Sequence, residues 1–373
     1  MSKKIAIFIP SLGGGGAERV IVTLANEIAD RGYSLDLVVS NAKGDYLNDV
    51  SKNVKLVDLR AKRVSRAFLP LCKYIMKEKP AAMLSVMTHT NIIAILAKII
   101  TCTPLRLIVS EHNTISAEKS KASAFNRTLI YGLVPYLYRF ANKVCTVSIA
   151  ASADLAEFIG VNKEQIVTIY NPFDLEIINK LSSEPISHPW FGAGEPPVLL
   201  AIGRLTEQKN FHLLIKAFKE LRLVYNARLL ILGEGHLRSD LEILLADLEL
   251  TSNDILMPGF VKNPYPYLSH CHAFILSSSW EGLPTVLIEA LACGAKIIST
   301  DCPSGPREIL EDGRWGRLVP VDSVADLTNE MINVLNEQKI INSNHLDVYQ
   351  RATFFDKKNA VDKYLELFGI GSD

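Results

Sequence analysis

Two glutamates eight positions apart carry the strongest chemical signal, Glu281 and Glu289 in the stretch Glu-Gly-Leu-Pro-Thr-Val-Leu-Ile-Glu. Pro284 and Thr285 are typical of a helix start, so we expect Glu281 in a loop and Glu289 inside the helix. Apolar residues flank Glu289, and a buried carboxylate is costly unless it is hydrogen-bonded. The paired hydroxyls of a ribose would satisfy it. A lysine or arginine of the core is the alternative partner.

The loop that contains Glu281 is a second candidate binding element. Glu281 precedes a glycine at the predicted helix start and is suited to hold sugar hydroxyls. In the segment from Gly282 to Pro284, the backbone N–H groups of Gly282 and Leu283 are expected to meet phosphate or sugar oxygens. A solvated surface glutamate is the structural alternative.

Two cations follow the first predicted strand of the second half, Arg204 after Gly203 and Lys209 five residues later. Two cations at a strand end, just before a helix, suit a diphosphate. The alternative is a pair of solvated surface charges. Gly233 ends the next strand in a Gly-Glu-Gly turn, which is a weak signal. Phe260 ends the turn-like stretch Pro-Gly-Phe, whose backbone groups could read the edge of a nucleobase.

In the first half, four glycines lie between a short apolar run and a helical pattern. Gly14, Gly15 and Gly16 belong to this run, and they let a ligand approach the backbone at the start of a helix. Neither the dinucleotide fingerprint nor the Walker pattern is present. We expect an anion or substrate site; a flexible turn is the alternative. His112, after another predicted strand, is expected to contact reacting groups, unless it is a structural loop histidine.

A metal site is not expected. His270-Cys271-His272 has metal-binding residue types, but no fourth ligand lies nearby in the sequence, and Asp-x-Asp is absent. The charge of a leaving diphosphate would then be met by Arg204, Lys209 and backbone N–H groups. No cofactor is expected.

The elements that would position these residues alternate between strand and helix. β-branched apolar runs separated by helical stretches predict parallel sheets, in an α/β fold of two Rossmann-like domains facing each other across a cleft. The predicted organisation consists of an N-terminal acceptor-binding domain, a linker rich in Ser, Pro and Gly, a nucleotide-sugar-binding domain, and a C-terminal helix that crosses back; these occupy residues 1–175, 176–197, 198–345 and 346–373.

Composition agrees with this plan. The chain has 373 residues, more than one core usually supports, and 48% are hydrophobic, which excludes disorder. The net charge of zero excludes a strongly basic nucleic-acid binder, yet residues 1–170 carry 22 basic and 13 acidic residues (+9) and residues 171–373 carry 18 and 27 (−9). The six cysteines show no paired spacing, and no signal peptide or membrane span is predicted, so we expect a cytoplasmic protein.

In this order, the motifs resemble those of the retaining family-4 glycosyltransferases of the GT-B fold, over nearly the whole chain. The resemblance rests on residues 13–19, 110–113, 170–174, 203–210, 233–235, 258–260, 281–289 and 301–310. The segment with the two glutamates is specific, whereas the glycine pairs are not. In place of the aspartate often found in this family before the strand 273–276, the chain has His272.

The resemblance implies a role for each candidate residue. Arg204 and Lys209 would hold the donor diphosphate, Glu289 its ribose and Glu281 its sugar ring, with Phe260 and Val261 at the base. His112 and the loop Gly14–Gly16 would complete the site from the acceptor domain. The family retains the anomeric configuration, through front-side attack in which the leaving phosphate helps to deprotonate the acceptor, so we assign no general base. UDP is the expected carrier, and GDP stays open.

A basic and aromatic surface in the first half suggests the acceptor. No acidic residue occurs from 119 to 153. Such a surface suits an anionic bilayer or the diphosphate of a polyprenyl-linked glycan, at the cytoplasmic face of the inner membrane. A core helix with a solvated basic face is the alternative. The candidate acceptor or membrane residues are Arg63, Arg66, Lys73, Lys119, Lys121 and Arg127.

Two other functions are possible at this stage. A nucleotide-sugar 2-epimerase has a similar fold and needs no acceptor. A non-catalytic, lipid-binding partner subunit would have a decayed site, which the set Arg204, Lys209, Glu281 and Glu289 argues against.

Overall fold

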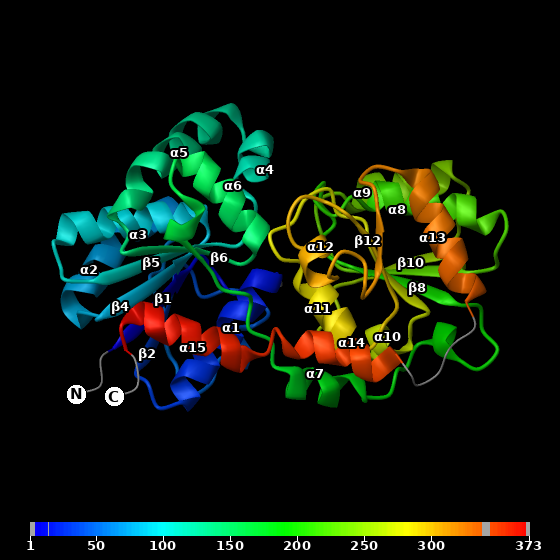
Figure 1. Cartoon of the computed structure of the whole chain (residues 1–373), viewed down its shortest axis with the longest axis horizontal. Coiled ribbons are helices and arrows are strands. Elements are labelled where there is room, and N and C mark those ends of the chain that lie inside the picture. The colour runs from blue at the N-terminus through cyan, green and yellow to red at the C-terminus, as the bar shows by residue number, and fades with distance from the viewer. Residues whose placement is uncertain (1–3, 14, 338–343, 371–373) are drawn as a thin grey trace. The chain divides into compact units, whose positions relative to one another are not determined.

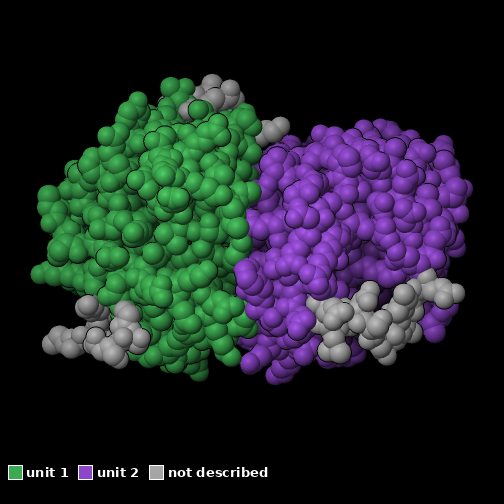
Figure 2. Space-filling model, in the orientation of Figure 1, with its two compact units in different colours: residues 1–173, 356–373 green, residues 174–355 purple. Residues whose placement is uncertain are grey.

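The computed structural model describes residues 4–13, 15–337 and 344–370. The chain forms two compact units (Figure 2). Unit 1 comprises Met1–Phe173 with Asp356–Asp373, and unit 2 comprises Asp174–Phe355.

Unit 1 contains a seven-stranded parallel sheet in the order β3-β2-β1-β4-β5-β6-β7. Its strands are β1 Ile5–Ile9, β2 Leu35–Val39, β3 Lys55–Asp58, β4 Ala82–Val86, β5 Arg106–Glu111, β6 Lys143–Thr146 and β7 Ile166–Thr168. Its helices are α1 Gly16–Asp30, α2 Phe68–Glu78, α3 Thr88–Thr101, α4 Ile115–Lys121, α5 Ala124–Leu137, α6 Ile149–Ile159 and α15 Lys357–Phe368, with short 3-10 helices at Leu47–Asp49, Val64–Ala67, Tyr138–Phe140 and Lys163–Gln165.

Both faces of this sheet are buried, which explains its uninterrupted apolar runs. In β1, Ile5, Ile7 and Ile9 pack in the core that includes α1 and α15. Ala6 and Phe8 point to the other face and pack in the core that includes α2, α3, α5 and α6 (Figure 1).

Unit 2 contains a six-stranded parallel sheet in the order β10-β9-β8-β11-β12-β13. Its strands are β8 Val198–Ile202, β9 Arg228–Leu232, β10 Ile255–Gly259, β11 Ala273–Leu276, β12 Ile297–Thr300 and β13 Arg317–Val319. Its helices are α7 Leu175–Ser182, α8 Phe211–Arg222, α9 Arg238–Asp247, α10 Tyr265–His270, α11 Thr285–Ala292, α12 Pro306–Ile309, α13 Val324–Asn336 and α14 Asn344–Thr353, with a 3-10 helix at Pro189–Phe191.

The strand order reverses once in each sheet, between β1 and β4 and between β8 and β11. In open parallel sheets, ligands bind outside the carboxyl ends of the strands at such a switch point. These two places are therefore where a site is sought.

The prediction of two parallel-sheet domains is confirmed, but three details are wrong. The predicted turn Pro258-Gly259 lies at the end of β10. Residues 176–182, assigned to the linker, belong to α7, which Asp174 caps by accepting from the Ile177 N–H at 3.0 Å. Leu175 and Ile178 bury one face of this helix, which packs against α10 and α11. Residues 346–353 belong to α14 in unit 2, so only α15 returns to unit 1.

Candidate functional site

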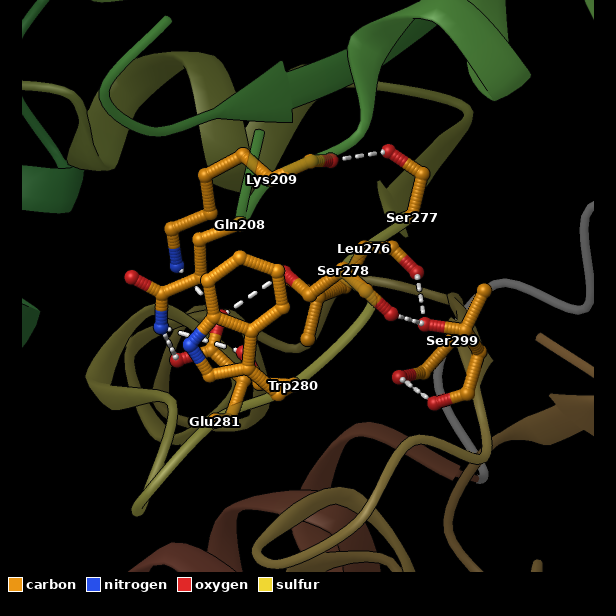
Figure 3. Close-up of polar contacts among 9 residues, drawn as sticks. Gln208, Lys209, Leu276, Ser277, Ser278, Trp280, Glu281 and Ser299 are labelled. Atoms are coloured by element: carbon orange, nitrogen blue, oxygen red, sulfur yellow. Dashed lines mark hydrogen bonds and ion pairs between the residues drawn. The ribbon is translucent and has the colours of Figure 1, made fainter. Parts of the chain in front are cut away.

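A buried ion pair lies at the switch point of unit 2. Lys209, in the loop between β8 and α8, places its Nζ 2.6 Å from Oε1 of Glu281, in the loop between β11 and α11 (Figure 3). Glu281 is 5% exposed, and the Lys209 side chain is 17% exposed. The structure therefore brings together two of the predicted site residues that are 72 positions apart.

Further hydrogen bonds hold the Glu281 carboxylate. Ser278 Oγ donates to Oε1 at 2.7 Å, and Gln208 Nε2 donates to Oε2 at 3.2 Å and to the Trp280 carbonyl at 3.0 Å (Figure 3). Ser277 Oγ donates to the Lys209 carbonyl at 2.8 Å. A charge-assisted network of this kind fixes both side chains before any ligand arrives. The sequence reasoning missed Gln208 and Ser278, although Ser278 lies three residues before Glu281.

Glycines at neighbouring strand ends let these loops pack closely. The Lys209 side chain lies over Gly203, where a Cβ would come within 3.1 Å of three of its carbons. Gly233 has φ +146°, and a Cβ there would lie 1.9 Å from the Gly203 carbonyl oxygen. Gly233 donates its N–H to Gly259 at 2.8 Å, so the ends of β8, β9 and β10 lie side by side. The glycines are therefore structural supports of the site.

Substitution of Gly233 should test this support. Gly233→Ala is expected to lower the free energy of unfolding by more than about 2 kcal/mol, because both the left-handed backbone and the Gly203 carbonyl oppose a Cβ. Gly192→Ala is the control, since its Cβ would meet Pro189 O only at 3.5 Å and Glu195 Cγ at 3.6 Å. Chemical denaturation of both variants measures the difference. Equal stability would contradict the packing described.

The segment Gly282–Pro284 is supported from the loop after β12. Ser304 Oγ donates to the Gly282 carbonyl at 2.7 Å, and a Cβ on Gly305, whose φ is +96°, would lie 2.3 Å from Pro284 Cδ. Gly282, Leu283 and Pro284 are all buried. This packing fixes the start of α11 and with it the direction of Glu281.

Glu289 lies inside α11, as predicted, and is 5% exposed. The Tyr265 hydroxyl of α10 donates to its Oε1 at 3.3 Å. Tyr265 is therefore a partner of Glu289 that the sequence did not identify, and the role of Glu289 toward a ribose stays a prediction.

The remaining candidates of unit 2 lie at the same strand ends. Arg204 follows β8 and is exposed. Phe260 and Val261 follow β10, and Phe260 is 41% exposed. The described contacts do not join these three side chains directly to Glu281 or Glu289, so their roles stay predictions.

In unit 1, His112 directly follows β5 at the carboxyl edge of the sheet. Both ring nitrogens are buried and have no hydrogen-bond partner within the described ranges. Burial lowers the pKa of His112 to about 4, so the ring is neutral at pH 7. A neutral ring offers one donor and one acceptor to a ligand.

The glycine run precedes α1, of which Gly15 is the N-terminal cap and Gly16 the first residue. Gly14 lies outside the described residues. Gly15 has φ −96° in extended backbone, and a Cβ on Gly13 would meet only Ser11 Oγ, at 4.0 Å. The backbone geometry at these two positions therefore does not require glycine, unlike that of Gly233.

The basic candidates occupy separate elements. Arg63, Arg66 and Lys73 are exposed on and before α2. Lys119 of α4 lies over the Phe158 ring at 4.7 Å. The side chains of Lys121 and Arg127 lie outside what the structure describes. On α2, Leu71, Cys72 and Ile75 are buried, so its apolar stripe is a core face.

The described residues contain no group of three or more His, Cys, Asp or Glu side chains arranged to hold a metal ion. Among the described helices, none has the length and apolar character needed to cross a membrane.

Two Rossmann-like units, with a cation and carboxylates at the switch point of the second, define the GT-B class of fold. Residues 183–352 match the family described as "Glycosyl transferases group 1", and residues 14–177 match "Glycosyltransferase Family 4". The chain belongs to the glycosyltransferase family that these two matches describe, and it is a glycosyltransferase.

Similar proteins span the whole chain. A Campylobacter jejuni N-acetylgalactosamine-N,N'-diacetylbacillosaminyl-diphospho-undecaprenol 4-alpha-N-acetylgalactosaminyltransferase is 32% identical, over 98% of this chain and 100% of that protein. The Rhizobium meliloti lipopolysaccharide core biosynthesis glycosyltransferase LpsE is 25% identical, over 95% of each chain. The structure of Anabaena HepE with UDP-glucose superposes with a TM-score of 0.81 at 18% identity, over 98% of this chain and 99% of that one.

Proposed function

We propose that this protein is a retaining, metal-independent hexosyltransferase. It moves a hexose or N-acetylhexosamine from a nucleotide sugar, with UDP as the favoured carrier, to a lipid-linked glycan of bacterial cell-surface polysaccharide, lipopolysaccharide or glycoprotein-glycan assembly. The observation that carries the donor half of this proposal is the buried Lys209–Glu281 pair at the switch point of unit 2.

The donor roles follow from the chemistry of each side chain. Lys209 and the exposed Arg204 supply positive charge for the diphosphate, and their attraction for it grows as the glycosidic bond breaks and charge moves to the leaving phosphate. Glu281 accepts from sugar hydroxyls, and Ser278 and Gln208 keep it oriented. Glu289 accepts from the hydroxyls of the ribose. The leaving phosphate helps to deprotonate the acceptor hydroxyl, which retains the anomeric configuration, and we assign no general base.

The acceptor part of the proposal is supported by two similar proteins and by the net charge of the first half of the chain. The C. jejuni relative described above and a second one, 29% identical over 98% of both chains, are named for undecaprenol-linked acceptors that carry a diphosphate. Residues 1–170 carry the excess of nine positive charges. A polyprenyl-diphosphate-linked glycan has the complementary charge, which supports this acceptor class.

Helix α5 gives the membrane part of the proposal a specific surface. Its inward residues Tyr131 and Val134 are buried, whereas Leu129, Leu133 and Tyr136 are 49%, 39% and 64% exposed on the opposite side. A cavity of about 520 Å³ is lined there by Thr128, Leu129, Gly132, Leu133 and Tyr136. An apolar outer face on a segment without acidic residues favours contact with an anionic bilayer, at the cytoplasmic face of the inner membrane.

This surface predicts the behaviour of one pair of variants. Leu133→Asp is expected to reduce co-sedimentation with anionic liposomes at low salt by about tenfold, because a carboxylate is repelled by the lipid headgroups and removes apolar area. Leu223→Asp, at an exposed apolar residue of unit 2, is the control and should bind like the unmodified protein. Failure of the unmodified protein to bind such liposomes would end the membrane proposal.

The reaction itself is tested by a donor screen. Isothermal calorimetry with UDP, GDP and their sugars identifies the carrier, and NMR of the product reports the anomeric configuration. We expect binding of a UDP-sugar and transfer with retention in the presence of a chelator. An inverted product, or a requirement for a divalent ion, would refute the corresponding part of the proposal. Because the chain belongs to a glycosyltransferase family, the epimerase and the non-catalytic subunit lose their support.

A further inference from the structure

Two carboxyl groups that the sequence analysis did not consider flank His112 in unit 1. Glu111, the last residue of β5, is 2% exposed. It accepts hydrogen bonds from Thr88 Oγ1 at 2.9 Å, Asn91 Nδ2 at 3.1 Å and the Tyr138 hydroxyl. Glu111 therefore ties the end of β5 to the start of α3 and to the segment after α5.

The residue on the other side of His112 is held in a similar way. Asn113 Nδ2 donates to Glu118 Oε1 of α4 at 3.0 Å, and the Tyr131 hydroxyl of α5 approaches Glu118 Oε2 at 3.4 Å. The two neighbours of His112 in the chain are thus both fixed, Glu111 by Thr88, Asn91 and Tyr138, and Asn113 by Glu118, which also accepts from Tyr131.

These carboxyl groups do not serve an ordinary salt bridge. Within the described ranges, neither Glu111 nor Glu118 pairs with a lysine or arginine. Burying an acid without a cation is expensive, so such groups persist where their hydrogen bonds serve a purpose. The turn before α3 also holds Met87 at φ +79°, anchored by its N–H to the Ser110 carbonyl at 3.0 Å. Strained backbone of this kind is concentrated at functional sites.

We propose that Glu111 and Glu118 are positioning residues, which hold His112 with both ring nitrogens directed to a substrate rather than to the protein. This inference rests on the proposed function, in which His112 contacts the reacting groups. Glu111 anchors the residue before His112, Glu118 accepts from the residue after it, and neither carboxyl bonds the ring, so the loop is fixed while the imidazole stays available. Helix α5 then has two roles, an outer face for the lipid surface and inner tyrosine hydroxyls that support the loop.

Ionisation of the network gives it a distinct signature. Burial, and then the Glu118 charge, raise the pKa of Glu111 to about 8, so its carboxyl keeps a proton at neutral pH and loses it as the pH rises through about 8. The titratable groups that face it are Glu118, Tyr138, Tyr131 and Cys145, and none of them is a cation. A negative charge that forms on Glu111 above pH 8 would therefore have no cation to compensate it, and it would loosen the loop that contains His112.

The test uses the full-length protein and reads the position of His112 without relying on turnover. NMR of histidine-labelled protein should show the His112 ring titrating near pH 4 in the unmodified chain. In Glu111→Ala the ring gains access to water, so its pKa should rise toward the ordinary 6.5. Glu111→Gln should preserve the low pKa of His112, because its carbonyl oxygen can accept from Asn91 and Tyr138 and its N–H group can donate to the Thr88 hydroxyl.

Kinetics supply the second measurement. Glu111→Ala is expected to lower kcat by about tenfold to 100-fold, as misplacement of a contacting group does, with the affinity for UDP unchanged. When His112 is already replaced by alanine, Glu111→Ala should lower kcat little further, because the side chain that Glu111 positions is gone. If Glu111 were only structural, adding Glu111→Ala to His112→Ala would lower kcat by a second, separate factor. Glu111→Gln should have the same kcat as the unmodified protein, and its kcat should not fall above pH 8. Tyr138→Phe, a milder change, replaces Glu111→Ala if that variant does not fold.

The outcomes separate the two proposals. The positioning role would be overturned if the pKa of His112 were unchanged in Glu111→Ala. It would also be overturned if the reductions in kcat caused by Glu111→Ala and by His112→Ala multiplied fully in the double variant. If the His112 pKa shifts as expected but no nucleotide sugar is turned over by the unmodified protein, the positioning stands and the proposed function fails.

Discussion

Lys209→Ala is expected to reduce kcat/KM for the nucleotide-sugar donor by about 100-fold to 1,000-fold, the loss typical of removing one group that stabilises developing charge. Lys209 is the cation that the structure places against Glu281, at 2.6 Å. Steady-state kinetics and calorimetric titration with UDP measure the effect. Lys216→Ala, at an exposed lysine of α8, is the matched control and should behave like the unmodified protein.

The same substitution has a consequence for stability. Without Lys209, the Glu281 carboxylate stays buried and loses its counter-ion, which costs about 3–5 kcal/mol at an uncompensated site. Ser278 and Gln208 still donate to it, so we expect the lower end of that range. Glu281→Gln in the Lys209→Ala background should recover part of the stability while activity stays low. Unchanged affinity for UDP in folded Lys209→Ala would refute the donor-site assignment.

Glu289→Ala is expected to weaken UDP binding by about tenfold to 100-fold, because two hydroxyls of a ribose would lose a charged acceptor. The sharper measurement compares UDP with 2'-deoxy-UDP and 3'-deoxy-UDP by calorimetry. The unmodified protein should prefer UDP, and Glu289→Ala should bind all three with similar affinity.

Two controls separate this role from packing. Tyr265→Phe removes the hydroxyl that donates to Glu289 at 3.3 Å and should weaken UDP binding only slightly, since the carboxylate remains. Glu242→Ala, on the exposed face of α9, should change nothing. If Glu289→Ala still discriminates UDP from its deoxy analogues, the carboxylate does not contact the ribose.

Local patterns predicted most of the elements, and the failures have identifiable causes. Buried parallel strands such as Ile5–Ile9 are continuous apolar runs, which the period of burial along the chain is enough to predict. β10 was missed because Pro258 and Gly259 are typical turn residues; they lie at the carboxyl end of a strand at the sheet edge. α7 was missed because its eight residues carry only a narrow apolar face in a segment rich in Ser and Pro.

The sequence by itself determined the fold class, the family and the residue types of the proposed donor site, because the period of burial, the strand-end motifs and the two glutamates are local in the chain. Only the tertiary structure decided which of them meet. The pairing of Lys209 with Glu281 requires β8 and β11 to be neighbours in the sheet, although their starts at Val198 and Ala273 lie 75 positions apart in the chain. The network around His112 likewise joins α3, α4 and the end of α5. Contacts between distant segments depend on strand order and helix packing, which no local pattern encodes.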